Sequence, residues 1–249
     1  MKSPKRVAAL VVAGLLAGCG GGGGGGAPVP PDPPATFAGL YAGSASAGRT
    51  FDALILDNGR FYAMLGTSAG GITDVYIGTS TATATTFDSV SAKDLDIASG
   101  ALRATTLTST GSPKVSIGGL LSGTITFNAT YDARFEAKPS LASIAGIYQG
   151  DARSPEGLGA INLTVSSTGV VTGSTLGCSL AGTVAPRADA NVYDLSINFG
   201  AGCKNSSRAI FAGHAVLGTI ANVPPGTRMT AIATDPDFMQ ALFIVAAKP

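Results

Sequence analysis

The sequence contains few charged residues. Of its 249 residues, 12% are Asp, Glu, Lys or Arg, which is about half of the usual share in a soluble domain. Tryptophan is absent, and Glu136 and Glu156 are the two glutamates. Because Glu, Lys and Leu normally fill helices, this scarcity and the 35 glycines favour an all-β protein. The net charge of +1 gives no electrostatic reason to expect a nucleic acid as partner.

Residue patterns of known chemistry are also scarce. His214 is the one histidine, so any Ser-His or Cys-His catalyst and any histidine-rich metal site must use it. The sequence has no phosphate-binding loop, CxxC pair, calcium loop or basic-aromatic stripe. A glycosidase-like pair among the scattered carboxylates stays open, because such residues meet only in space. We therefore expect a protein without cofactor or metal that is not an enzyme.

The first 18 residues have the pattern of a signal peptide. Lys2, Lys5 and Arg6 precede an apolar run from Val7 to Leu16, which is too short to span a bilayer of roughly 20 helical residues. We therefore expect residues 1–18 to be a leader for export.

The end of this leader resembles the lipobox of bacterial lipoproteins, in the residues Leu16-Ala17-Gly18-Cys19. The resemblance implies cleavage before Cys19 and attachment of about three acyl chains, palmitate among them, which anchor a protein stably to a membrane. By analogy with the sorting rule of enteric bacteria, Gly20 after the cysteine favours the outer membrane, at its periplasmic face or at the cell surface. The alternative is an ordinary secretory leader with an incidental cysteine.

A tether follows the cysteine. Residues 20–26 are all glycine and residues 27–34 are rich in proline, so the segment has nothing to bury. We expect residues 19–36 to be a disordered linker that reaches roughly 40 Å.

The remainder of the chain contains two copies of one motif. Ala38-Gly39-Leu40-Tyr41-Ala42-Gly43 recurs as Ala145-Gly146-Ile147-Tyr148-Gln149-Gly150. We take residues 37–138 and 139–249 as two domains, and we expect both tyrosines to be buried aromatics of the core or of a corner.

Hairpins with glycine turns mark the start of each domain. Residues 53–56 and 61–65 flank Asp57-Asn58-Gly59, and residues 161–165 and 170–171 flank Ser167-Thr168-Gly169. Further strands are expected at about 72–79, 83–90, 100–108, 114–121, 124–135, 178–186, 192–199, 208–217, 228–234 and 240–247. Seven or eight short strands per domain predict two tandem antiparallel up-and-down β-barrels of lipocalin-like type, or curled sandwiches, with one helical turn at 139–145.

Two cysteines remain for a disulfide if Cys19 carries lipid. A hairpin symmetric about residues 190 and 191 places Cys178 opposite Cys203. An exported protein meets an oxidising compartment, so we expect the bridge to form and to contribute roughly 3 kcal/mol. The alternative is two free thiols.

One motif resembles a catalytic turn. Gly66-Thr67-Ser68-Ala69-Gly70 matches the G-x-S-x-G nucleophile elbow, but an extended pattern follows it where that elbow needs a helix. We expect Ser68 in a hairpin loop and His214 half-exposed on a strand. A serine-type hydrolase that uses Ser68 and His214 is the last of the functional alternatives.

Taken together, the lipobox, the tether, the paired Gly-(Leu/Ile)-Tyr-x-Gly motifs and residues 177–184 with Cys203 resemble a group of proteobacterial lipoproteins of unassigned function. The architecture is also distantly similar to the barrel domains of transferrin-binding surface lipoproteins, which bind host proteins through loops. We expect a non-catalytic, lipid-anchored binding or interaction module of the cell envelope, with a protein partner at the surface or in the periplasm. The alternative is a carrier of a small molecule in a barrel lumen.

Overall fold

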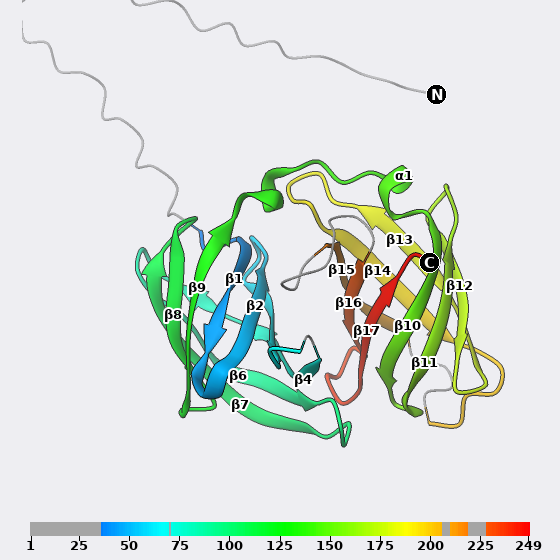
Figure 1. Cartoon of the computed structure of the whole chain (residues 1–249), viewed down its shortest axis with the longest axis horizontal. Coiled ribbons are helices and arrows are strands. Elements are labelled where there is room, and N and C mark those ends of the chain that lie inside the picture. The colour runs from blue at the N-terminus through cyan, green and yellow to red at the C-terminus, as the bar shows by residue number, and fades with distance from the viewer. Residues whose placement is uncertain (1–35, 70, 206–209, 219–227) are drawn as a thin grey trace, which may run out of the picture. The chain divides into compact units, whose positions relative to one another are not determined.

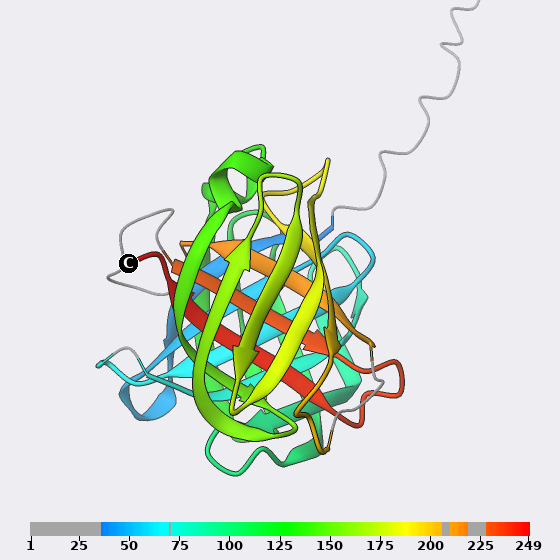
Figure 2. The same ribbon diagram turned by 90° about the vertical axis from the view of Figure 1, so that its right-hand side faces the viewer.

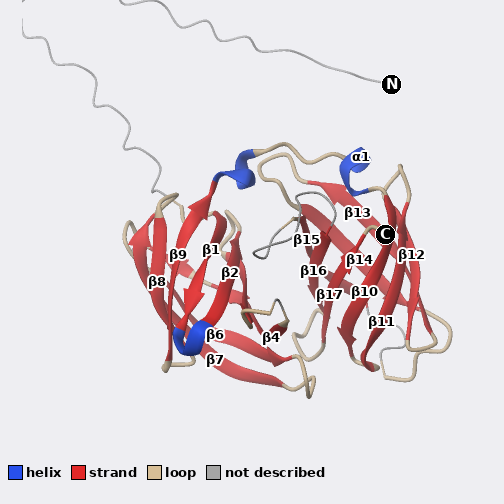
Figure 3. Cartoon of the chain, viewed as in Figure 1, coloured by secondary structure: helices blue, strands red, loops and turns tan. Residues whose placement is uncertain are grey.

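The computed structural model describes residues 36–69, 71–205, 210–218 and 228–249. They form two closed antiparallel barrels in tandem (Figures 1 and 3). Barrel 1 consists of β1 (Gly39–Ala45), β2 (Arg49–Ile55), β3 (Arg60–Gly66), β4 (Ile72–Thr79), β5 (Thr81–Ala82), β6 (Phe87–Asp96), β7 (Leu102–Ser112), β8 (Ser116–Leu121) and β9 (Ile125–Asp132). Barrel 2 consists of β10 (Gly146–Ser154), β11 (Gly157–Val165), β12 (Val170–Thr175), β13 (Cys178–Pro186), β14 (Tyr193–Phe199), β15 (Ile210–Leu217), β16 (Arg228–Thr234) and β17 (Ala241–Ala247).

Each barrel is a meander in which sequential strands pair. In barrel 1, β1 pairs with β9, and pairing of β4 with β6 closes the ring, while the short β5 pairs with the start of β6. In barrel 2, pairing of β10 with β17 closes the ring. Figure 2 shows the strands of barrel 2 inclined to the barrel axis, as closure of a twisted sheet requires. The prediction of tandem up-and-down barrels is thus confirmed, and curled sandwiches do not form.

The two predicted glycine turns are present. Gly59 joins β2 to β3 with a φ of 79°, and Gly169 joins β11 to β12 with a φ of 83°. Only glycine adopts this backbone region without strain, so these residues fix where each hairpin reverses.

The repeated tyrosines have the same role in both barrels. Tyr41 is 1% exposed and its hydroxyl donates a hydrogen bond to the carbonyl of Phe37 at 3.1 Å. Tyr148 is fully buried and donates to the carbonyl of Ile144 at 2.7 Å. Each tyrosine therefore ties the entry of its barrel to the chain four residues earlier, which confirms that both are core aromatics.

In the described part of the chain, three short helical segments connect or interrupt the strands: η1 (Ser46–Gly48), η2 (Ala133–Glu136) and α1 (Leu141–Ile144). α1 is the predicted helical turn between the barrels. The Ser140 hydroxyl caps it by accepting a hydrogen bond from the backbone amide of Ser143 at 3.2 Å.

The strand predicted at 83–90 is shifted in the structure. β6 runs from Phe87 to Asp96, and its pairing with β7 shifts between Ser89 and Ala92. Val90 lies at this bulge with 90% of its surface exposed. The bulge interrupts the alternation of apolar residues, and charged residues follow it, so the sequence pattern does not show the second half of the strand.

A third hydrophobic cluster joins the two barrels. It lies outside both interiors and combines the outward side chains of β2 to β4 with those of β15 to β17, including Leu54, Met64, Val216, Ile232 and Phe243. All five are at most 5% exposed. Residues 34–249 accordingly form one compact unit.

This shared cluster explains a difference between strands. β3 and β16 are buried on both faces along almost their full length, whereas β13 alternates between buried and exposed residues. A strand at the barrel interface packs one face into its own barrel and the other against the neighbouring barrel.

Candidate functional site at the barrel interface

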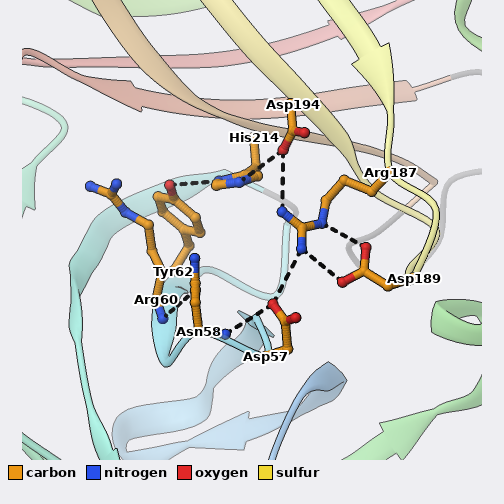
Figure 4. Close-up of polar contacts among 8 residues, drawn as sticks. All are labelled: Asp57, Asn58, Arg60, Tyr62, Arg187, Asp189, Asp194 and His214. Carbon is orange, nitrogen blue, oxygen red and sulfur yellow. Dashed lines mark hydrogen bonds and ion pairs between the residues drawn. The ribbon is translucent and has the colours of Figure 1, made fainter. Parts of the chain in front are cut away.

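The single histidine connects the two barrels. His214 lies on β15, and its Nδ1 atom is 2.8 Å from the hydroxyl oxygen of Tyr62 on β3 (Figure 4). Its Nε2 atom is 3.3 Å from Asp194 Oδ1. Asp194 is the direct cross-strand partner of His214 on β14, so the sheet register itself places the carboxylate beside the ring.

These contacts determine which nitrogen of the His214 ring carries the hydrogen. A carboxylate can only accept, so Nε2 carries the hydrogen and donates to Asp194, which leaves Nδ1 to accept from the Tyr62 hydroxyl. The histidine is therefore assigned as the neutral Nε2–H tautomer. Both ring nitrogens have a protein partner.

Burial keeps this pair neutral. Desolvation lowers the pKa of His214 to about 4, although Asp194 acts in the opposite direction. Desolvation also raises the pKa of Tyr62 to about 12. The ring is thus uncharged and the phenol protonated at neutral pH.

Arg187 extends the network along the interface. It lies in the loop after β13 and pairs with Asp189 at 2.7 Å, with Asp57 at 3.2 Å and with Asp194 at 3.4 Å. Asp57 belongs to the turn between β2 and β3, so this guanidinium bridges the barrels. The Asp57 carboxylate also accepts from the backbone amide of Asn58 at 2.9 Å, which orients it. Because the three carboxylates are 46% to 59% exposed, the network fixes geometry more than it adds stability.

This network holds strands of the two barrels together. Tyr62 is 1% exposed, and neither Tyr62 nor His214 lines the interface pocket or the interior cavities described below. A general base needs a free nitrogen within reach of a substrate proton. Here both nitrogens are engaged in holding β3, β14 and β15 together.

A second polar group crosses the interface at Asp52. This residue is 6% exposed, and burial raises the pKa of its carboxyl to about 6 despite the nearby Arg134 and Arg228. Arg134 itself pairs with Asp132 and donates a hydrogen bond to the carbonyl of Gly218 in barrel 2. Arg134 therefore ties the end of barrel 1 to the end of β15.

A pocket of about 380 Å³ opens at the same interface, where β10, β16 and β17 meet the start of β4. Two arginines line it, Arg153 and Arg228, together with apolar side chains from both barrels. By contrast, a cavity in each barrel interior measures about 10 Å³, with Phe127 among the lining residues in barrel 1 and Leu163 in barrel 2. Both interiors are filled by side chains at these positions.

The predicted hydrolase residues are not brought together. Ser68 is exposed in the turn between β3 and β4, in barrel 1, and makes no hydrogen bond to His214. His214 does lie on a strand, but its side chain is 11% exposed where we expected a half-exposed ring. The difference arises because the outer face of barrel 1 covers this part of β15.

The predicted disulfide is present, with a different register. Cys178 and Cys203 are bonded, and their Cα atoms are 4.6 Å apart. The hairpin of β13 and β14 pairs Leu180 with Phe199, so Cys203 lies beyond the end of β14 rather than opposite Cys178 in the ladder. A turn that includes Gly202, with a φ of 83°, returns the chain to the start of β13. Cys19, which is predicted to carry lipid, and the predicted leader and tether up to residue 35 lie outside the described residues.

The sequence contained little information about Tyr62, Asp194, Arg187 and Asp57. None of them forms a motif with His214, from which Tyr62 is separated by 152 residues. The predicted strands at 192–199 and 208–217 place Asp194 and His214 on consecutive strands, but their direct pairing is seen only in the structure.

Comparisons with known proteins assign no family. No protein-family model, curated protein or solved structure matches the chain. Within the described residues there is no group of three or more His, Cys, Asp or Glu placed to hold a metal ion. No helix in that same part of the chain is long and apolar enough to cross a membrane.

Proposed function

We propose that the protein is a lipid-anchored binding module of the bacterial cell envelope, without catalytic activity. In this proposal residues 1–18 are a signal peptide, Cys19 carries the acyl chains that hold it in the outer membrane, and the Gly/Pro segment displays the barrels. The partner is a protein in the periplasm or at the surface, and no nucleic acid or cofactor is involved. The proposal includes the distant architectural resemblance to transferrin-binding surface lipoproteins.

The observation that carries the proposal is the shared hydrophobic cluster between two filled barrels. Such a unit is a platform that leaves its loops and the pocket at the barrel interface available to a partner. A hydrolase reading lacks support, because the only histidine is committed to Tyr62 and Asp194. The alternative hypothesis, a carrier of a small molecule, is supported by one feature. This feature is the pocket between the barrels, and not a barrel lumen.

Metabolic labelling with an alkyne-bearing fatty acid tests the anchor. The proposal predicts labelled wild-type protein and no label after Cys19→Ser. The matched control is the double variant Cys178→Ser/Cys203→Ser, which removes the other two cysteines and keeps the label. Equal labelling of the Cys19→Ser variant, or an unlabelled wild type that still retains residues 1–18, overturns the proposal.

A further inference from the structure

The pocket between the barrels has one apolar side. Ile97 and Phe243 are 8% and 4% exposed, and Ile72 and Val245 are half-buried beside them. Ile72 and Ile97 come from barrel 1, and Phe243 and Val245 come from β17 of barrel 2. The volume of about 380 Å³ holds roughly a dozen water-sized groups, so a ligand here is small.

The other side of the pocket carries two guanidinium groups. Arg153 is 8% exposed and donates from Nε to the carbonyl of Ile97 at 2.7 Å and from Nη2 to the carbonyl of Ala98. Its Nη1 makes no hydrogen bond within the described part of the chain. The protein backbone thus holds this guanidinium in place with one donor group unused.

Arg228 is the less satisfied of the two. It is half-buried, and its guanidinium makes neither a hydrogen bond nor an ion pair with the described residues, while its backbone carbonyl accepts a hydrogen bond from the amide of Gly218 at 2.8 Å. Burial lowers the pKa of its guanidinium, and the Asp52 carboxyl opposes this effect from a distance. The guanidinium of Arg228 therefore has N–H groups free to donate charge-assisted hydrogen bonds to an anionic ligand in the pocket.

The charge of the lining sets the charge of the ligand. Asp151 is the one carboxylate among the lining residues; it is exposed, and it forms no ion pair within the described residues. Two guanidinium groups and one carboxylate leave an excess of one positive charge, which a single negative charge neutralises.

We infer that this pocket binds a small organic monoanion, with its carboxylate between Arg153 and Arg228 and a short apolar chain against Ile72, Ile97, Phe243 and Val245. Guanidinium groups bind carboxylates through charge-assisted hydrogen bonds, and the apolar wall selects against fully hydrated ions. This inference rests on the proposed function, because it gives the binding module a class of ligand.

Isothermal titration of the full-length protein with octanoate is the test. Octanoate has one carboxylate and about ten non-hydrogen atoms, which suits the pocket volume. Octanol carries the same chain without the charge, and inorganic phosphate carries charge without the chain. We expect octanoate to bind at least about tenfold more tightly than either probe.

Three variants locate the site. Arg228→Gln is expected to weaken octanoate binding at least about tenfold, and the matched control Arg103→Gln, an exposed arginine on β7, leaves it unchanged. Leu158 lines the pocket and is 50% exposed, so a charge there does not threaten folding. Leu158→Glu is expected to weaken binding about threefold or more, and Leu158→Lys to strengthen it by a similar factor.

Absence of octanoate binding at millimolar concentration overturns the inference. If octanol binds as tightly as octanoate, the arginines do not recognise the carboxylate. If phosphate binds as tightly as octanoate, the apolar side of the pocket does not contribute. If octanoate has the same affinity for the Leu158→Glu and Leu158→Lys variants, it binds elsewhere. These results are independent of fatty-acid labelling at Cys19, so failure of the pocket and failure of the envelope proposal are told apart.

Discussion

The pKa of His214 is the most specific quantity that the barrel interface predicts. Burial lowers it from 6.5 to about 4. If Tyr62 of barrel 1 supplies the hydrogen bond that satisfies the neutral ring, Tyr62→Phe leaves Nδ1 without a donor. Loss of a hydrogen bond to the neutral form favours protonation, so the variant should raise the pKa by about one unit.

The direction of the stability change follows from this value. Between pH 4 and pH 6.5 the unfolded chain binds a proton at His214 that the folded protein does not, so the contribution of His214 to stability falls as the pH falls through this range. Lowering the pKa from 6.5 to about 4 corresponds to about 3 kcal/mol of unfolding free energy. The loss is complete below about pH 4.

Proton NMR of the imidazole is the assay, and it needs no assignment because the chain contains one histidine. The ring resonance should titrate near pH 4 in the wild type and about one unit higher in Tyr62→Phe. Tyr76→Phe is the control, because Tyr76 is a buried tyrosine of the barrel 1 interior with no contact to His214. A wild-type midpoint between pH 6 and 7, or equal midpoints in both tyrosine variants, refutes the proposed contact between the barrels.

Three further predictions concern stability in denaturant. In urea titrations, Asp52→Asn should raise the free energy of unfolding by up to about 3 kcal/mol above pH 6 and leave it unchanged at pH 3. The reason is that the raised pKa makes ionisation of this carboxyl oppose folding. The same difference between variant and wild type at both pH values would contradict this. The double variant Cys178→Ser/Cys203→Ser should lose about 3 kcal/mol, and added reductant should then have no further effect, since the bridge joins residues 25 apart. Gly213→Ala should lower the free energy of unfolding by at least about 2 kcal/mol, because its Cβ would lie 1.9 Å from the carbonyl oxygen of Ile232 on the facing strand. In the control Gly71→Ala the nearest atom is 3.6 Å away, and the free energy of unfolding should change by less than about 0.5 kcal/mol. Similar losses in both variants would contradict the close packing at Gly213.

Local patterns made most of the fold predictable. The turns at Gly59 and Gly169 need positive φ, and both are flanked by apolar residues that alternate or run continuously, so each hairpin is defined within about 15 residues of chain. The disulfide followed from the small number of cysteines and the predicted hairpin. Its exact register did not, because the turn that includes Gly202 adds residues after the last paired strand position.

The interface was not predictable from such patterns. Runs such as Phe61 to Leu65 are apolar on both faces, which indicates a fully buried strand but does not say what covers the second face. The partner surface lies on β15 to β17, far along the chain. For the same reason His214 was expected to be half-exposed, since the residue that covers it, Tyr62, belongs to the other barrel.

The most direct test of the central claim is the location and mass of the mature protein in the cell. Membranes of the organism that expresses the protein are separated on a density gradient, and the protein is identified by its intact mass. We predict a species in the outer-membrane fraction that lacks residues 1–18 and carries acyl chains on Cys19, and release of the Cys19→Ser variant from that fraction. An unacylated protein in the soluble cytoplasmic fraction, with residues 1–18 still attached, would contradict it.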